Sequence, residues 1–304
     1  MPRRALGLFA IAAALWGASY LFIKVGLEDG LSEPVIIFVR TALGAIVLVP
    51  LGLRAGALPA LLERRGSTVA LALLQVVIPF GLITWGERWI DSGLAGVLVA
   101  SAPVFLAMIA PFLAPDESSH GMALVGIVVG IVGVGALFGA DLSGDAEALA
   151  GGAMVVGAAL SYAFAVLLVK RRFAGVPAVG VAASTMVVSA GLWLPAALVS
   201  LPDTAPHADA IASMVVLGAG GTGVAFYAFY TLIAEYGPAR ASLVAYVAPA
   251  FAVAYGVVLL DEPLTAGVLI GLVLVLLGSW LAAGGGVSRS GPSRSSAPAP
   301  ARAR

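Results

Sequence analysis

Long apolar stretches separated by short polar links run along most of the chain. Each stretch holds about 20 residues, the length that crosses a bilayer as a helix, and is bounded by charged residues, proline or glycine. The apolar residues are continuous rather than alternating, which predicts helices and not the strands of a membrane barrel. We expect ten membrane-spanning helices, over residues 5–26, 34–53, 67–86, 92–113, 121–140, 148–169, 178–200, 210–233, 238–260 and 264–283.

Motifs recur between the two halves of this pattern. The segment 102–105 (APVF) matches 248–251 (APAF), and an Asp-Glu pair follows each of them, at 116–117 and 261–262. Five helices per half is an odd number, so the second half enters the membrane from the opposite side. We therefore expect an all-α membrane protein with two inverted five-helix repeats around a central cavity, a site that can face either side in turn. The expected repeats are residues 5–140 and 148–283.

Basic residues favour one side of the expected membrane. If the N-terminus lies in the cytoplasm, the inner links and the two tails hold thirteen Lys and Arg residues, whereas the outer links hold only Arg88. Cytoplasmic segments of membrane proteins carry this excess of basic residues. We expect a multi-pass protein of the cytoplasmic membrane with both termini in the cytoplasm. Residues 284–304, rich in Ser, Pro, Ala and Arg, are expected to form a disordered cytoplasmic tail.

Composition supports a membrane protein and argues against several kinds of chemistry. The chain is 61% hydrophobic and 11% charged, whereas soluble domains are about 25% charged. The net charge of zero gives no support for nucleic-acid binding, and the absence of cysteine removes thiolate chemistry. The two histidines fall in links, and the acidic pairs have no accompanying metal-ligand cluster, so they are read as caps of the helices that follow. We expect no cofactor, no metal site and no enzymatic centre.

The motifs resemble the two EamA domains of the drug/metabolite transporter superfamily. The resemblance rests on WGASYLFIK in the first helix, the helix that carries Arg40, the APVF segment, and the final APAF…LLDEPLTAGVLIGLVLVLLGSWL segment, and it covers residues 5–283. It implies ten helices, the fifth and tenth at the periphery, and transport of small metabolites such as amino acids, often as export. A non-transporting sensor or scaffold, and an intramembrane enzyme, are the alternative functions.

Polar and aromatic side chains share one face of the first expected helix. Trp16, Tyr20 and Lys24 recur every four residues, and Ser19 lies beside them. Trp16 is about 18 Å from Arg4 along the helix axis, so an aromatic belt at the membrane interface does not account for it. We expect Trp16, Ser19 and Tyr20 to line the cavity. Lys24 either lines the cavity or extends to the outer surface.

Arg40 is expected about 9 Å inside the outer boundary of the second helix. A charge at this depth is costly unless it is paired or hydrated. One interpretation is a structural ion pair that closes the outer end, and the other is contact with an anionic group of the substrate at the outer mouth. The candidate acidic partners are Glu28, Asp29, Glu33, Glu87 and Asp91.

Further cavity candidates come from the third helix and from the second half. A tyrosine buried in a helix bundle needs a polar partner, and a water-filled cavity supplies one. Thr222, Phe226 and Tyr230 lie on one helical face. The expected cavity residues in this group are Gln75, Tyr162, Tyr227, Tyr230 and Tyr246.

Prolines and glycines have a different expected role. Pro103 and Pro249 occupy matching places in the two halves, inside expected helices, and are candidate hinges. Small residues recur every three to four positions in the fifth and tenth helices, at Gly126, Gly130 and Gly271 among others, which predicts close helix packing; the alternative use of this spacing is a homodimer contact.

Acidic residues are expected only near helix ends. Transporters that carry protons usually have a titratable group within the membrane, and Glu87 falls about 30 Å along the third helix, at its outer end. We therefore expect a uniporter or exchanger that proton and sodium gradients do not drive. Its partners are expected to be a small-molecule substrate and the lipid bilayer.

Overall fold

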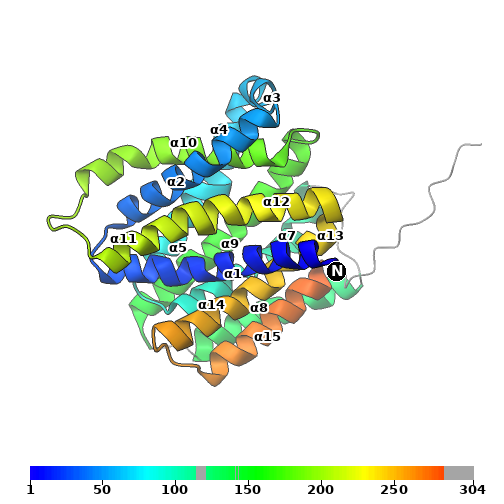
Figure 1. The fold of residues 1–304 in the computed structure, drawn as a ribbon. Helices are drawn as coiled ribbons and strands as arrows, with labels where there is room; N and C mark the ends of the chain where they lie inside the picture. Colours follow the sequence, from blue (N-terminus) through cyan, green and yellow to red (C-terminus); the bar gives the residue numbers. More distant parts are fainter. Residues whose placement is uncertain (114–120, 141, 143, 284–304) are drawn as a thin grey trace, which may run out of the picture.

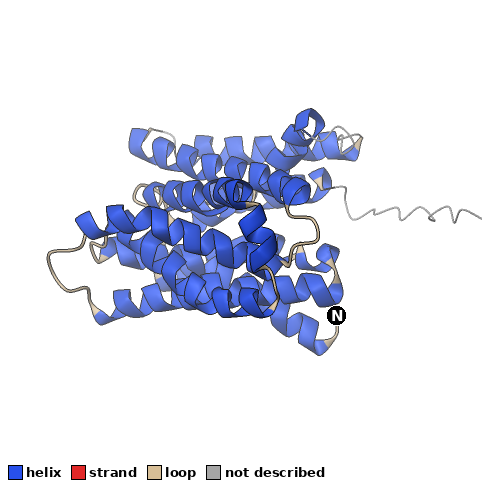
Figure 2. Ribbon diagram, turned by 90° about the horizontal axis from the view of Figure 1, so that it is seen from above, coloured by secondary structure: helices blue, strands red, loops and turns tan. Residues whose placement is uncertain are grey.

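The computed structural model describes residues 1–113, 121–140, 142 and 144–283, and in these residues it contains helices and no strand. The long helices lie side by side along one common direction (Figure 1), and a view turned by 90° shows the same arrangement (Figure 2). Among the described residues, eight helical segments are long and apolar enough to cross a membrane, and two further apolar helices are shorter. Three of the eight, over Arg65–Gly86, Ser92–Leu113 and Ala208–Tyr236, consist of consecutive shorter helices. The expected all-helical membrane architecture is confirmed. The acidic pair at 116–117 and the tail 284–304 lie outside the described residues.

The helices follow the apolar stretches in order. The first half contains α1 (Arg3–Glu28), α2 (Glu33–Arg54), α3 (Leu58–Glu63), α4 (Arg65–Ala72), η1 (Leu73–Val77), α5 (Ile78–Gly86), α6 (Ser92–Val99), α7 (Ala102–Leu113) and α8 (Met122–Ala140). The second half contains α9 (Ala146–Arg172), α10 (Ala178–Val199), α11 (Ala208–Val215), η3 (Val216–Val224), α12 (Ala225–Tyr236), α13 (Pro238–Ala241), α14 (Val244–Leu259) and α15 (Ala266–Ala282). The segments η1 and η3 are π-helical turns inside longer helices.

Proline divides two of the expected spans. Pro79 and Pro103 each occupy the second position of a helix, in α5 and α7. Proline lacks the N–H that a helix interior uses, but it is well accepted in the first helical turn. The π-turn η1 therefore precedes α5, and a turn at 100–101 separates α6 from α7.

The helix expected over 238–260 begins later than predicted. Gly237 ends α12 with a φ of 87°, a left-handed conformation that glycine adopts without strain. The four-residue helix α13 follows, and α14 begins only at Val244. A glycine and a proline in succession thus shorten this helix.

The π-turn η3 lies directly against α2. A Cβ added at Gly223 would lie 2.6 Å from the Cβ of Val47, a separation that real side chains do not show. Within η3, Thr222 donates a hydrogen bond from Oγ1 to the main-chain oxygen of Leu217 at 3.1 Å. Glycine therefore allows the approach of two helices from different halves, and it places a threonine hydroxyl between them.

Helices α8 and α15 pack closely through glycine. A Cβ added at Gly126 would lie 2.2 Å from the main-chain nitrogen of Ala282, and one at Gly278 would lie 2.3 Å from that of Gly130. The packing role predicted from the spacing of small residues is confirmed. A homodimer remains a prediction.

The end of the bundle opposite the N-terminus, here named the distal end, is tied together by polar contacts. The links 29–32, 87–91, 200–207 and 260–265 contribute to it. The contacts between links are His207 with Asp29, Arg88 with Glu33 at 2.6 Å, and Ser32 with Ser200 at 2.7 Å. These contacts join α1, α2, α5 and α10 at one end.

Glu262 does not cap the helix that follows it. Its two carboxylate oxygens accept hydrogen bonds from the main-chain N–H groups of Ser92 and Gly93, at 2.7 and 2.9 Å, at the start of α6. Thr265 caps α15 instead, because its hydroxyl accepts from the N–H of Val268 at 3.0 Å. The expected capping role of Glu262 was therefore wrong for α15, and the residue joins the two halves at the distal end.

Candidate functional site

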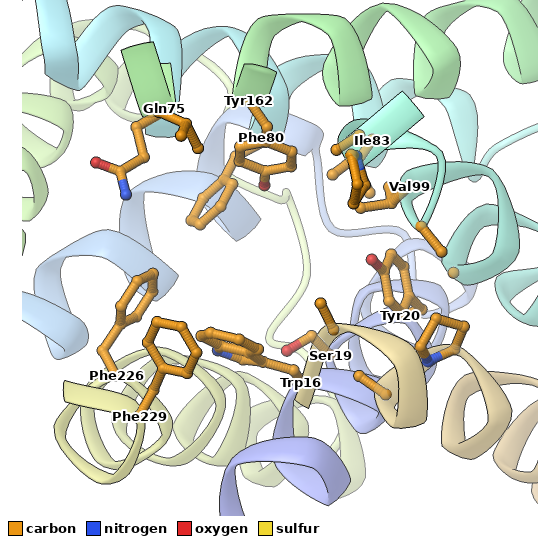
Figure 3. A pocket seen from close by; sticks show the side chains of 18 of the residues that line it. Trp16, Ser19, Tyr20, Gln75, Phe80, Ile83, Val99, Tyr162, Phe226 and Phe229 are labelled. Atoms are coloured by element: carbon orange, nitrogen blue, oxygen red, sulfur yellow. The ribbon is translucent and has the colours of Figure 1, made fainter. Parts of the chain in front are cut away.

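Helices of both halves enclose a cavity of about 380 Å³ (Figure 3). Its lining comes from α1, α2, η1, α5, α6, α7, α9, α12 and α14. Cavities that bind small molecules have volumes in this range. Of the residues expected to line a cavity or to act as hinges, the lining includes Trp16, Ser19, Tyr20, Arg40, Gln75, Pro103, Tyr162, Tyr230 and Pro249.

Aromatic rings form one wall of the cavity. The ring of Trp16 on α1 lies 5.5 Å from the ring of Phe226 and 4.8 Å from the ring of Phe229, measured between centroids. Tyr230 continues this cluster, 5.8 Å from Phe226. These rings come from helices of different halves and offer a large apolar contact surface with fixed geometry.

Hydroxyl groups interrupt the apolar lining. Tyr20 and Tyr162 come from α1 and α9, the first helix of each half, and both point their hydroxyl groups toward the open centre in Figure 3. The hydroxyl of Ser19 instead donates to the main-chain oxygen of Leu15 at 3.1 Å. The cavity is thus mostly apolar with a few polar groups, which is typical of sites for small molecules.

Arg40 brings a buried cation to the cavity. Its side chain is 7% exposed, its Nε donates to the hydroxyl of Thr222 at 3.1 Å, and its guanidinium carbon lies 3.7 Å from the ring centre of Phe80. The hydrogen bond uses one of five N–H groups, and the ring contact is a cation–π interaction.

The ion pairs considered for Arg40 are not formed. None of the ion pairs among the described residues includes Arg40. Two of its expected partners, Glu33 and Asp29, pair with Arg88 and His207 instead. These two acids lie at or beside the link between α1 and α2, and the basic groups that contact them there come from neighbouring links.

Gln75 lies on the π-turn η1, which directs its amide into the cavity (Figure 3). Its Oε1 atom is buried and has no hydrogen-bond partner among the described residues. A buried amide oxygen without a hydrogen-bond donor costs free energy. A ligand with an N–H or O–H group would supply the missing partner.

Lys24 does not line the cavity but reaches a link at the distal end. Its ammonium donates hydrogen bonds to the main-chain oxygens of Glu87 and Ile90, at 2.9 and 3.2 Å. Carbonyl groups at the end of a helix lack partners within the helix and attract cations. The expected place in the cavity lining was therefore wrong, because the link after α5 lies within reach of α1, whereas extension toward the outer surface stays a prediction.

Tyr227 and Tyr246 do not belong to the cavity. Tyr227 is 45% exposed on α12, because consecutive residues of a helix point about 100° apart and Phe226 takes the inward direction. The hydroxyl of Tyr246 donates to the main-chain oxygen of Ser279 on α15 at 3.4 Å. Helical spacing alone did not distinguish inward from outward faces here.

The two candidate hinges differ in their surroundings. Pro103 follows the turn that separates α6 from α7, whereas Pro249 lies within the continuous helix α14. Both prolines line the cavity. A hinge role therefore stays a prediction for both residues, with a local break at Pro103 only.

Sequence reasoning missed two phenylalanines of the lining, Phe80 and Phe229. Phe229 is three residues after Phe226 and shares its face of α12, so helical spacing could have found it. Phe80 follows Pro79, and no polar neighbour distinguishes it from other apolar residues. Its contact with Arg40 depends on how α2 packs against α5.

Glu87 is enclosed, not exposed at a helix end. It directly follows α5 at the distal end, its side chain is 0% exposed, and neither of its carboxylate oxygens has a hydrogen-bond partner among the described residues. The expected position at the end of this helix is correct, and the burial of the side chain is what sequence did not predict. Among the described residues, no group of three or more His, Asp and Glu side chains is placed to hold a metal ion.

Comparisons with known proteins agree with these features. The family model "EamA-like transporter family" matches residues 3–139 and again residues 149–284. The uncharacterized transporter YoaV of Bacillus subtilis is 26% identical over 92% of this chain and 97% of its own length. A probable amino-acid metabolite efflux pump of Escherichia coli is 25% identical over 92% of this chain and 95% of its own length.

A solved crystal structure has the same fold. It is 22% identical in sequence, covers 91% of this chain and 96% of its own, and superposes with a TM-score of 0.65. The family model matches nearly the whole chain, in two successive units. The chain therefore belongs to the EamA-like transporter family, and the protein is a multi-pass membrane transporter.

Proposed function

We propose that the protein exports a small amphipathic solute with an anionic group, such as an amino acid or a related metabolite, across the cytoplasmic membrane. The observation that carries this proposal is Arg40, a buried cation that lines the cavity and takes part in none of the described ion pairs. A carboxylate of the solute would form charge-assisted hydrogen bonds with its remaining N–H groups.

The rest of the lining suits the other parts of such a solute. Trp16, Phe226 and Phe229 would contact an apolar side chain or a ring. Gln75 and the hydroxyls of Tyr20 and Tyr162 would accept hydrogen bonds from polar groups of the solute or donate hydrogen bonds to them. Amino acids combine these chemical features, and one relative is named a probable amino-acid metabolite efflux pump, which supports both the solute class and export.

Transport would proceed by alternating access between two inverted repeats. Two features support this mechanism: the cavity takes its lining from both halves, and the first helix of each half contributes a tyrosine, Tyr20 and Tyr162. The excess of basic residues on the N-terminal side supports a cytoplasmic location of both termini. The distal end would then face the outside of the cell.

Counterflow of radiolabelled amino acids in proteoliposomes tests the role of Arg40. Arg40→Gln should raise the KM for an amino acid by about 10- to 100-fold, because a hydrogen bond to a charged group contributes about 1.5–3 kcal/mol. Tyr227→Phe, on the exposed face of α12, serves as the control and should leave the KM unchanged. An unchanged KM in Arg40→Gln, or no exchange of any anionic solute by the unaltered protein, would refute the proposal.

A further inference from the structure

Glu87 is a buried acid that the proposed solute site does not use. It is absent from the cavity lining, is 0% exposed, and has no hydrogen-bond partner for either carboxylate oxygen among the described residues. Three other acids of the distal end are partnered: Asp29 by His207, Glu33 by Arg88, and Glu262 by the first N–H groups of α6. Glu87 therefore differs from them in lacking any donor.

The charged groups around Glu87 direct their donors elsewhere. Lys24 from α1, Arg40 from α2 and Glu262 from the link before α15 are close enough to interact electrostatically with it, as is the phenol of Tyr20. The donors of Lys24 go to main-chain oxygens, and Arg40 contacts Thr222 and Phe80. No ion pair within 4.0 Å joins Glu87 to either cation in the described part of the chain. An ionised carboxyl without a donor is unfavourable in such an enclosed place, whereas the protonated form is neutral.

Two groups that interact electrostatically with Glu87, Glu262 and Tyr20, also touch a close contact between α6 and α14. A Cβ added at Gly96 would lie 2.5 Å from the Cβ of Ala252, and one at Gly93 would lie 3.1 Å from the Cα of Val253. Glu262 reinforces this contact through its hydrogen bonds to the start of α6. We name the contact of Gly93 and Gly96 with Ala252 and Val253 the distal seam. It adjoins the ring of Tyr20, which lines the cavity.

We propose that Glu87 is a proton-binding site whose protonation holds the distal seam closed. The proposal rests on the alternating access proposed above, in which α6 and α14 separate to open the cavity distally. On opening, distal water reaches the carboxyl group, which releases its proton to that water and becomes a hydrated carboxylate. On closing, the carboxylate takes a proton back from the same side. No net proton crosses the membrane, so distal pH sets the rate of opening without driving accumulation of solute.

Cysteine labelling of the full-length, cysteine-free chain in proteoliposomes tests this proposal. Val253→Cys reports on the seam, and Asp203→Cys, at an exposed distal position, corrects for the intrinsic pH dependence of thiol reactivity. With Glu87 intact, the corrected rate of labelling by an impermeant maleimide should rise with distal pH, by at most about tenfold per pH unit for one proton. In Glu87→Gln the rate should be low and independent of pH. A pH response in Glu87→Gln equal to that of the parent would overturn the proposal.

Control variants separate Glu87 from other titrating groups. His207→Gln removes the exposed histidine of the distal end, and Glu63→Gln removes an exposed acid far from the seam; both should keep the pH response. Loss of the response in His207→Gln and its retention in Glu87→Gln would identify the wrong group and overturn the proposal. Hydrogen exchange of the α6 amides, compared between the unaltered chain and Glu87→Gln, gives the same test if Val253→Cys does not fold.

The labelling experiment tests the proton site, and the flux experiment tests transport, so each proposal can be refuted without the other. A pH response of the seam without flux of any solute would refute transport and leave the proton site intact. Flux of amino acids with a seam that ignores pH would refute the proton site and leave transport intact.

Discussion

At the scale of single residues, partners from distant segments decide what a polar side chain does. Arg40 contacts Thr222 and Phe80, which lie on η3 and α5, and not the acids that were closest in the expected topology. Lys24 binds main-chain carbonyl oxygens of the link after α5. The residue type at each of these positions limits the possible contacts, but packing selects among them.

A residue-scale prediction concerns the pair of His207 and Asp29 at the distal end. The hydrogen bond that the His207 imidazole donates to the carboxylate of Asp29 raises the pKa of His207 above its usual value, and the same bond lowers the pKa of Asp29. For His207, the stabilisation is complete below the pKa of the unfolded chain and is lost as pH rises through the raised pKa. For Asp29, it is present above the usual pKa and is lost as pH falls through the lowered value.

The pair should therefore be formed at mildly acidic to neutral pH. NMR titration of the His207 imidazole should give a pKa above about 6.5, the usual value. In Asp29→Asn the pKa should fall back toward that value, because the charged partner is gone. An identical His207 pKa in the two proteins would contradict the described pairing.

At the scale of helices, breaks concentrate around the cavity. The turn between α6 and α7 and the π-turn η1 both contribute residues to the lining, and the π-turn η3 holds the threonine that contacts Arg40. π-turns are frequent at functional sites, since they free main-chain groups and redirect side chains. By contrast, α8 and α15 are continuous helices that pack against each other and contribute nothing to the lining.

A helix-scale prediction concerns the contact of α8 with α15. Gly278→Ala should lower the free energy of unfolding by about 1–3 kcal/mol, because its methyl group would lie 2.3 Å from main-chain atoms of Gly130 and the helices would have to separate. Gly135→Ala on α8 is the matched control, since nothing lies within 4 Å of the added methyl group. Thermal unfolding in detergent measures both. Equal effects of the two substitutions would show that the glycine contact is unimportant.

At the scale of the whole molecule, two helical halves share one cavity and are joined by contacts at the distal end. The distal seam and the polar contacts between links join segments far apart in sequence. Separation of the halves at this end would require these contacts to break together.

A whole-molecule prediction concerns the orientation in the membrane. Cysteines introduced at Asp145 and Asp203 should react with impermeant reagents outside intact cells, and one at Arg65 should react only after the membrane is opened, because the basic residues predict a cytoplasmic N-terminus. All three positions are exposed in the fold. Labelling of Arg65→Cys in sealed cells would reverse or refute this orientation.

Helical spacing predicted several of the residues that line the cavity. The residues that it placed there wrongly share one cause. Trp16, Tyr20 and Tyr162 were expected at the cavity and line it. Tyr227 was also expected there and is exposed, because the sequence shows which residues share a helical face but not which face turns inward. A nearly uniform apolar helix gives little amphipathic signal to decide that direction.

The sequence by itself determined the helical class, the approximate helix ends and the family, because lipid requires long apolar helices and proline and glycine mark their limits. Only the tertiary structure decided the ionic contacts and the enclosure of Glu87. The rotation of each helix about its axis, and the neighbours that its side chains contact, depend on close packing, as at Gly96 against Ala252. A shift of a few ångströms changes which donor reaches which acceptor. The burial of an acid is therefore a property of the packed bundle and not of its position along the chain.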